Sequence, residues 1–493
     1  MKQTSFLRQC LSLAGGTLVV MFISALTMPV ITRLADPSVY GQVTIFNTWC
    51  SLAVMVCSLG LDQTFIRFFY TGKTPAIQRR ILSFCLAVPL LLCLLLSCAL
   101  LPVLIGEQSR FLVLCFILAL FVRTLNRMGM LVLRLKYRTS LYSAMSVLNK
   151  SLYVILVLAG MRLFSGHGLT VMIGASLAAM TACVAAELYA ERTFWFKTRP
   201  APAQSIEPRH LLAYSLPLMA ACAVFLVFQA TDRFCIRWFA DYDQVGVYAS
   251  AQSIMNLFSV ITSTFQTLWL PRAIEHYERD PQDRTLYRDM NRIMTVIMFL
   301  FGAAVLLLKD VFVLFLGESY RQAAGVLPFL LFTPIMSTVS ETTVIGLAVT
   351  RHSAGHLWIM GTVTVFNVAG NLLLVPVMGI QGAAVATGIS YILYFWLRTA
   401  VTARHFRVGY PLKRFSLLTA WFALTCWYHQ HHSFSVMTIL LFLLTVALTL
   451  GLYPDTTRQI LRQIRKLLAG PVNLSVGKGT GKEDRRSCEV SPG

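Results

Sequence analysis

Long apolar runs recur along the whole chain and are separated by short polar segments. A helix needs about 20 mostly apolar residues to cross the hydrocarbon core of a bilayer. Fourteen runs approach or reach this length, so we expect an all-α integral membrane protein with about fourteen transmembrane helices. The expected spans are 11–31, 42–61, 81–105, 111–133, 143–161, 169–189, 211–231, 245–268, 293–316, 325–349, 355–377, 380–402, 415–429 and 434–453.

The composition supports a membrane protein. Of the 493 residues, 56% are hydrophobic and 13% are charged, and the mean hydropathy is +0.67. Soluble domains carry about a quarter charged residues, so a soluble globular protein is excluded. The first apolar run follows Lys2 and Arg8, as in a signal peptide, but it is long enough to span and lacks a small-x-small cleavage site. We expect it to be the first transmembrane helix.

The net charge of +21 is distributed in alternate short loops. If the N-terminus is cytoplasmic, most of the basic residues fall on the cytoplasmic side, including a segment that begins with Arg398 after the twelfth span. This pattern predicts two cytoplasmic termini, and it speaks against a nucleic-acid partner, which would require a basic face. The opposite side carries only Arg33, Arg110, Arg162, Arg233, Arg237, Lys309 and Arg321.

The sequence contains an internal repeat. When the sequence is compared with itself at an offset of 205 residues, the Ala-Asp pair at 35–36 matches the Ala-Asp pair at 240–241. At the same offset, Gly41 matches Gly246 and Arg67 matches Arg272. An even number of helices separates the copies, which predicts two parallel six-helix lobes. We expect lobes at 1–205 and 206–405, two further helices at 406–453, and a cytoplasmic tail at 454–493. The tail opens with a basic amphipathic segment, and a polar stretch expected to be disordered follows it.

Motifs for catalysis or metal binding are not found in the sequence. The twelve cysteines form no CxxC pair and lie mostly in apolar runs, so we expect neither disulfides nor a metal site. Walker A, HExxH and GxSxG motifs do not occur. We therefore expect a protein that is not an enzyme and has no cofactor.

Four local strings carry a resemblance to a known family. They are ADPSVYG at 35–41, LGLDQTFIRFF at 59–69, VGVY at 245–248 and GIQGAAVAT at 379–387. In this order and spacing, the sequence resembles the polysaccharide transporter family of the multidrug/oligosaccharidyl-lipid/polysaccharide (MOP) exporter superfamily, over about residues 5–450.

The resemblance implies a flippase of the bacterial cytoplasmic membrane. Its substrate would be an undecaprenyl-pyrophosphate-linked oligosaccharide for O-antigen, capsule or exopolysaccharide assembly. Membrane lipids, a polysaccharide polymerase and a chain-length regulator would be its other partners. With no ATP-binding motif, the driving force would be an ion gradient, the membrane potential or consumption of the product.

Three basic residues within spans are candidates for binding the pyrophosphate. Arg123 and Arg127 lie four residues apart, which places them on one helix face, and guanidinium groups bind phosphate oxygens in pairs. Lys150, expected near the start of the fifth span, is a further candidate. The alternative for each is that the side chain extends to the lipid headgroups. This alternative is favoured for Arg134, which continues the same face.

Four residues are candidates for gating or coupling. Asp62 and Arg67 are expected near the cytoplasmic end of the second span. They are five residues apart and do not face each other on an ideal helix, so Asp62 requires another cationic partner. Arg67 and Arg272 would be equivalent gate residues, or ordinary interfacial arginines. Glu341 lies within a hydroxyl-rich stretch of the tenth span, and its alternatives are a coupling carboxylate or a structural hydrogen bond.

The side expected outside holds two polar clusters. Asp232, Arg233 and Arg237 end the seventh span, where a solvated helix end is preferred over an outer gate. His429, His431 and His432 have no acidic companions in sequence and are expected to be exposed rather than to bind a metal.

Two related functions and one unrelated function compete with this prediction. A multidrug or cation antiporter would have twelve helices and an acidic cavity. A peptidoglycan-precursor flippase would have nearly the same fold and charge. A membrane polymerase or ligase would require a large outer loop, which this sequence lacks.

Overall fold

The computed structural model describes residues 3–70, 74–100, 110–164, 166–197, 208–346, 353–459 and 462. These residues form helices and connecting turns, without a strand, which confirms the all-α expectation. Within them, ten helices are long and apolar enough to cross a membrane, or eleven if a pair bent by 59° counts as one span. The protein is therefore a multi-pass membrane protein, and the number fourteen stays a prediction.

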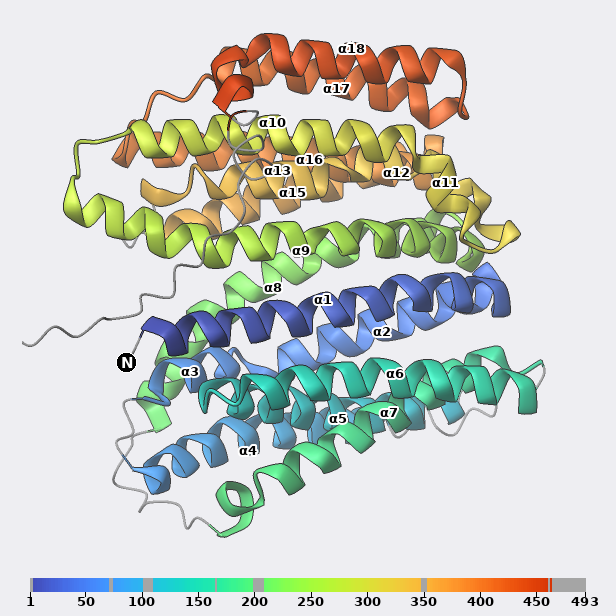
Figure 1. Cartoon of the computed structure of the whole chain (residues 1–493). Coiled ribbons are helices and arrows are strands. Elements are labelled where there is room, and N and C mark those ends of the chain that lie inside the picture. Colours follow the sequence, from blue (N-terminus) through green and yellow to red (C-terminus); the bar gives the residue numbers. More distant parts are fainter. Residues whose placement is uncertain are drawn as a thin grey trace, which may run out of the picture.

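Long helices make up most of the described N-terminal half (Figure 1). It contains α1 (Gln3–Leu34), α2 (Pro37–Ser58), α3 (Leu61–Phe68), α4 (Pro75–Leu100), α5 (Arg110–Leu135), α6 (Thr139–Leu163), α7 (Gly168–Ala190) and a π-helical turn (Thr193–Lys197).

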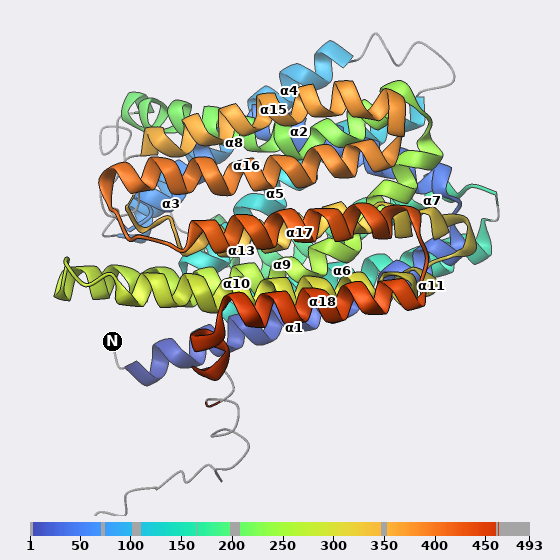
Figure 2. The ribbon, with the colours of Figure 1, turned by 90° about the horizontal axis from the view of Figure 1, so that it is seen from above.

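The C-terminal half contains two unusually long helices and one broken region. Its elements are α8 (Pro208–Phe239), α9 (Tyr242–Arg279), α10 (Thr285–Leu307), α11 (Lys309–Leu314), the 3-10 helix η4 (Glu318–Gly325), α12 (Leu327–Leu330), α13 (Phe332–Glu341), α15 (Ser353–Met378), α16 (Ile380–His405), α17 (Leu412–His431) and α18 (Val436–Leu452). Helices α17 and α18 pack on α12 and α10, on the side of this half away from the N-terminal half (Figures 1 and 2).

The two halves meet mainly where α1 and α2 pack against α8 and α9. We call the end of the bundle where α1 begins the proximal end, and the opposite end, where α1 turns into α2, the distal end (Figure 1). The largest apolar core lies in the C-terminal half and also includes Met28 and Ile45 from the other half. The halves are therefore joined by shared apolar packing as well as by the chain.

A reciprocal backbone contact joins the two halves at the distal end. A Cβ atom at Gly41 would collide with the carbonyl oxygen of Tyr242, and one at Gly246 would collide with the carbonyl oxygen of Pro37. The repeat offset of 205 residues relates Pro37 to Tyr242 and Gly41 to Gly246, so each copy makes the same contact with the other. Glycine is needed here because only a residue without a side chain allows two backbones to approach this closely.

Several expected helix boundaries are wrong. Helix α2 ends at Ser58 because Leu59 and Gly60 adopt left-handed conformations, so Asp62 and Arg67 lie on the separate short helix α3. Arg272 lies within α9, which continues to Arg279, and not at a helix end. Lys150 lies near the middle of α6 rather than at its start.

Three further expectations require correction. Asp232 and Arg233 lie inside α8, which continues to Phe239, because the polar side chains find partners within the bundle. Glu341 is the last residue of α13 and not deep in a span. Arg398 lies in α16 and is 5% exposed, so it does not belong to a cytoplasmic loop.

The cysteines are mostly buried, and the tail lies largely outside the described residues. The ten cysteines that can be assessed are free thiols, and seven of them are buried. The amphipathic segment and the polar tail lie almost entirely outside the described residues, which end at 459 and 462.

Candidate substrate cavities and polar networks

A cavity of about 620 Å³ lies where α2 and α5 face α8. Arg123 and Arg127 line it from α5, and both side chains are half-buried. Their four-residue spacing directs them to the same side of the helix. The wall on α8 is mostly apolar and consists of Ala221, Cys222, Phe225 and Leu226. The two guanidinium groups are therefore the main charged groups in this cavity.

A second cavity, of about 830 Å³, lies between α1, α2, α6 and α9. Its polar lining includes Lys150 and Asn149 from α6, Asn47 from α2 and Asn256 from α9. The Lys150 ammonium group lies 6.0 Å from the centre of the Tyr153 ring. Lys150 therefore faces the interior between the two halves and does not extend to the membrane surface.

The side chains of Arg123 and Asn47 connect the two cavities. Nη2 of Arg123 donates a hydrogen bond to Oδ1 of Asn47, and the two residues line different cavities. The Nε atom of Arg123 is buried and has no hydrogen-bond partner among the described residues. Arg123 thus retains a free donor at the boundary of the cavities.

Arg127 forms an ion pair with Asp62 that sequence reasoning did not identify. Nη2 of Arg127 lies 2.5 Å from Oδ2 of Asp62, which also accepts a hydrogen bond from Nε2 of Gln63 at 3.0 Å. The Asp62 side chain is 5% exposed and that of Arg127 is 38% exposed. The sequence indicated that Asp62 requires a cationic partner, and the turn at 59–60 is what brings α3 into reach of α5.

Arg67 and Arg272 lie near the proximal end on two different helices. Arg67 is exposed in the last turn of α3, and Arg272 is exposed within α9 beside Pro271. Neither lines the two cavities between the halves. Their positions fit ordinary interfacial arginines, and an equivalent gating role stays a prediction.

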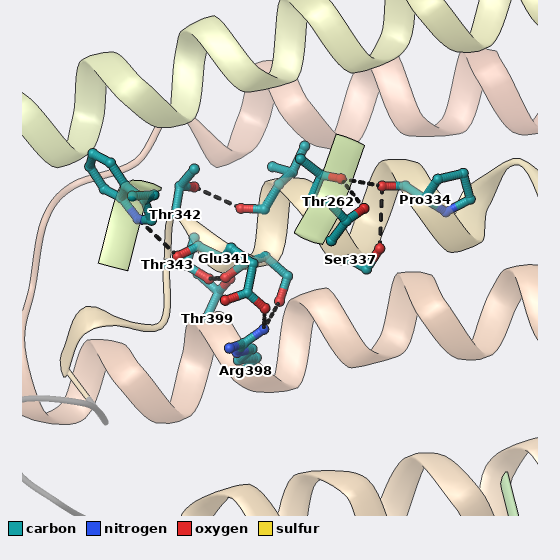
Figure 3. A network of polar contacts seen from close by, with 12 residues as sticks. Thr262, Pro334, Ser337, Glu341, Thr342, Thr343, Arg398 and Thr399 are labelled. Carbon is teal, nitrogen blue, oxygen red and sulfur yellow. Dashed lines mark hydrogen bonds and ion pairs between the residues drawn. The ribbon is translucent and has the colours of Figure 1, made fainter. Parts of the chain in front are cut away.

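Glu341 and Arg398 form a buried ion pair at the end of α13 (Figure 3). Oε1 of Glu341 lies 2.7 Å from Nη1 of Arg398, which also donates to Oγ of Ser340 at 2.9 Å. The sequence singled out Glu341, but it placed Arg398 in a loop and missed the pair. Removing one partner of such a pair would leave the other charge buried without compensation, which is strongly destabilising.

Other polar groups at the end of α13 also form hydrogen bonds with neighbouring helices. Nε1 of Trp269 on α9 donates to the carbonyl oxygen of Glu341 at 3.1 Å. Nδ2 of Asn291 on α10 donates to Oγ1 of Thr342 at 2.8 Å. The broken end of α13 is thus anchored to α9, α10 and α16.

Asp232 is the centre of a second buried network, near the distal end of the C-terminal half. Its carboxylate accepts hydrogen bonds from the hydroxyl of Tyr248 at 2.5 Å, from Nδ2 of Asn371 at 2.9 Å and from Oγ1 of Thr387 at 2.8 Å. Oδ1 of Asn371 and Oδ1 of Asn367 are buried and have no partner among the described residues.

The Asp232 network supplies a carboxylate, amide oxygens and a hydroxyl, which are the ligand types of hard cations. Sequence reasoning missed it because its members come from four helices. The one available signal was an acidic residue followed by Arg233. The guanidinium of Arg233 donates to Thr48 of α2 and to Gln252 of α9, at 3.0 and 2.8 Å, and so connects the two halves.

The N-terminal half contains two further buried carboxylates that the sequence did not single out. Glu187 accepts a hydrogen bond from Nδ2 of Asn126 at 2.9 Å, and its Oε2 has no partner among the described residues. Glu191 lies at the proximal end and pairs with Lys136 and Arg138 at 2.7 and 2.8 Å. Glu191 therefore fixes the turn that follows α5.

The three histidines at the end of α17 differ in exposure. His429 is buried in α17, where its Nδ1 atom lies 2.8 Å from the carbonyl oxygen of Thr425, so the expectation that it is exposed is wrong. His431 and His432 are exposed, as expected. In the described part of the chain, no group of three or more His, Cys, Asp or Glu residues is placed to hold a metal ion.

The two helical halves meet at a reciprocal backbone contact and enclose polar cavities at their junction. Solved structures share this fold. The lipid II flippase MurJ, in an inward closed conformation, superposes with a TM-score of 0.66 at 12% identity, covering 92% of this chain and 99% of that one. An inward-facing MATE family multidrug resistance transporter of the MOP superfamily gives a TM-score of 0.60 at 15% identity, covering 78% and 93%.

A third structure of this fold is a MOP superfamily transporter from Pyrococcus furiosus, described as having a binding pocket of reversed polarity. It gives a TM-score of 0.53 at 16% identity and covers 80% of this chain and 96% of that one. No curated protein sequence matches the chain. The sequence profile described as "Polysaccharide biosynthesis protein" matches residues 6–277, more than half of the chain. The chain belongs to this polysaccharide biosynthesis family, which confirms the resemblance found in the sequence.

Proposed function

We propose that the protein is a flippase that moves a polyprenyl-pyrophosphate-linked oligosaccharide across the bacterial cytoplasmic membrane by alternating access. The observation that carries this proposal is the position of Arg123, Arg127 and Lys150 in the two cavities between the halves. Charged groups at membrane depth are costly and usually mark a transport path. Both termini would be cytoplasmic, and the distal end would face outward.

The chemistry of the cavities suits the three parts of such a substrate. The free Nε of Arg123 and the exposed side of Arg127 can bind pyrophosphate oxygens. The amides and hydroxyls of the larger cavity, which include Asn149 and Ser253, suit a glycan. The polyprenyl tail can stay in the bilayer, because apolar chains need no cavity there.

Asp62 provides a way to release the substrate. When the cavity is empty, its carboxylate neutralises Arg127. A bound pyrophosphate competes with Asp62 for the same guanidinium group, so rebinding of Asp62 favours departure of the anion. In this proposal Asp62 acts in coupling through its ion pair with Arg127, and Arg67 and Arg272 act as gate residues at the proximal end.

Two buried carboxylates are candidates for coupling to an ion gradient. Protonation of Glu341 would remove the partner of the buried Arg398 and loosen the contact between α13 and α16. Asp232 is supported by its oxygen-rich surroundings, which could accept a cation in place of a proton. The substitutions Glu341→Gln and Asp232→Asn test the two residues separately.

The alternatives within the superfamily predict different substrates. A peptidoglycan-precursor flippase is supported by the similarity in fold to MurJ, which acts on lipid II. The similarity in fold to MATE transporters supports a multidrug antiporter. The arginines in the cavity speak against this function, because they would repel cationic drugs. A polysaccharide polymerase and a chain-length regulator would act on the exported product.

The deciding experiment is transport in reconstituted vesicles. The purified protein is incorporated with fluorescent undecaprenyl-pyrophosphate-linked repeat unit, and separately with lipid II or a cationic dye. Movement of the repeat-unit lipid alone is the expected result. Movement of lipid II or the dye in its place would assign one of the other two functions.

A further inference from the structure

A third cavity lies at the distal end of the C-terminal half, apart from the two cavities between the halves. Its volume is about 560 Å³, and it shares no lining residue with either of them. The lining comes from the start of α9, from α11 and η4, from the turn between α15 and α16, and from the end of α17. Gln322 and Ser433, both exposed, lie at its edge and open it to solvent.

Four glutamine side chains from four separate elements converge on this cavity. They are Gln244 of α9, Gln322 of η4, Gln381 of α16 and Gln430 of α17. Each amide offers two hydrogen-bond donors and an oxygen with two acceptor sites. The cavity thus presents neutral donors and acceptors from several directions.

Part of this hydrogen-bonding capacity is unused. Nε2 of Gln430 donates to Oε1 of Gln381 at 3.3 Å. Gln430 is 5% exposed, and its Oε1 atom has no hydrogen-bond partner among the described residues. The Oε1 atom of Gln244, which is half-buried, also has no partner among them. A buried polar atom without a partner costs about 1–3 kcal/mol, so a ligand or bound water that satisfies it is stabilising.

Two glycines keep the amides accessible. A Cβ atom at Gly325 would lie 2.8 Å from Nε2 of Gln381, and one at Gly379 would lie 3.2 Å from Oε1 of Gln244. Gly379 also has a φ of +58°, which favours glycine. A larger residue at either position would push an amide group out of its place.

The charges at the cavity cancel. Nζ of Lys309 lies 2.9 Å from Oδ1 of Asp310, and Oδ2 of Asp310 accepts a hydrogen bond from the backbone nitrogen of Phe434 at 2.7 Å. The ion pair neutralises Lys309, and the other ionisable groups in the lining, His431 and His432, carry ring nitrogens that donate or accept hydrogen bonds. The chemistry suits a neutral ligand in which every polar group both donates and accepts.

We propose that this distal cavity binds a saccharide through the amides of Gln244, Gln322, Gln381 and Gln430. Sugar hydroxyls donate and accept hydrogen bonds as the amides do, and sugars are the hydroxyl-rich compounds expected beside an exporter of glycans. The choice of a saccharide rests on the proposed function. The bound glycan is either the head of the transported lipid after translocation or free saccharide on the distal side.

The test is binding of a free oligosaccharide to the full-length protein in detergent. The probe is the oligosaccharide released by mild acid from the lipid-linked pool of the host cells, titrated by calorimetry. We expect Gln381→Leu and the exposed-site variant Gln322→Ala each to weaken binding about fivefold, which corresponds to one lost hydrogen bond of about 1 kcal/mol. Gln282→Ala, at an exposed glutamine of the proximal end, is the matched control and should bind as the unmodified protein does.

Either of two results would overturn the proposal. One is that the unmodified protein does not bind the oligosaccharide, and the other is that both variants bind it with unchanged affinity. A transport assay with the same variants identifies the source of the ligand: slower transport indicates the glycan of the transported lipid, and unchanged transport with lost binding indicates free saccharide. Since transport by the unmodified protein is measured separately, failure of this proposal is distinguishable from failure of the flippase proposal.

Discussion

Arg127 of α5 and Asp62 of α3 form an ion pair of 2.5 Å in which the acid is buried and the base is partly accessible. The pair is asymmetric, because the cavity reaches the guanidinium group of Arg127 but is not lined by Asp62. Removing one partner therefore has a different consequence from removing the other.

For this pair, Arg127→Ala should lower both transport and the amount of folded protein. The buried Asp62 is then left without its cation, and breaking a buried pair costs about 3–5 kcal/mol. Asp62→Asn should leave abundance near normal, since Arg127 can contact water. The double variant should recover abundance but not transport, as measured by immunoblotting and vesicle assays. A double variant with normal transport would contradict the role of Arg127 in binding.

Arg123 should affect transport with little effect on folding. Its hydrogen-bond partner, Asn47, is neutral, so Arg123→Ala leaves no buried charge behind. We expect transport to fall at least tenfold at normal abundance, and Arg123→Lys to recover part of it, since a lysine provides the charge without the paired donors. Arg134→Ala, at the exposed end of the same helix, is the control and should transport normally.

Substitutions of Glu341 should distinguish coupling from structure. Glu341→Leu leaves Arg398 buried and unpaired and should reduce abundance, with recovery in the Glu341→Leu/Arg398→Leu variant. Glu341→Gln keeps a hydrogen bond to Arg398 and should fold. If Glu341 exchanges a proton, the Gln variant transports slowly and does not respond to an imposed proton gradient. A Gln variant with the normal rate and gradient response assigns a structural role only.

Asp232→Asn is the corresponding test of the Asp232 network. The amide can retain hydrogen bonds from Tyr248 and Thr387 but has lost the charge that would hold a cation. We expect a folded protein whose transport no longer depends on an imposed sodium or proton gradient. Thr387→Val, which removes one donor and keeps the carboxylate, should weaken the dependence without abolishing it. Unchanged coupling in Asp232→Asn would remove this residue from the transport cycle.

Cysteine labelling should establish which end of the bundle faces the cytoplasm. Ser140 is exposed at the proximal end and Ser433 is exposed at the distal end. A membrane-impermeant maleimide added to intact spheroplasts should label Ser433→Cys and not Ser140→Cys, relative to the unmodified chain. The opposite pattern would reverse the orientation inferred from the basic loops.

The sequence was sufficient to predict the fold class, because the length of an apolar run is a local property of each helix. It was sufficient to predict the family because the four strings that carry the resemblance are also local. Arg123 and Arg127 could be selected for a related reason: an arginine within an apolar run is conspicuous without any knowledge of its surroundings. Their positions on one helix face follow from spacing alone.

The partners of these residues could not be predicted in the same way. Asp62 reaches Arg127 only because two left-handed residues end α2 and redirect the chain into α3. Arg398 was placed in a loop because basic residues near helix ends normally reach water, whereas here Glu341 compensates its burial. The Asp232 network depends on neutral side chains from separate helices, which have no periodic pattern in the sequence.

The close approach of Gly41 and Gly246 also determines how the distal end can move. A contact made by backbone atoms cannot adjust through side-chain rotation, so the two halves are either seated against each other or fully separated there. In Gly41→Ala, the added methyl group would collide with the carbonyl oxygen of Tyr242. This would shift the population towards conformers whose distal end is open. Because Gly41 and Gly246 make the same contact from opposite halves, the same restriction on movement acts on both halves.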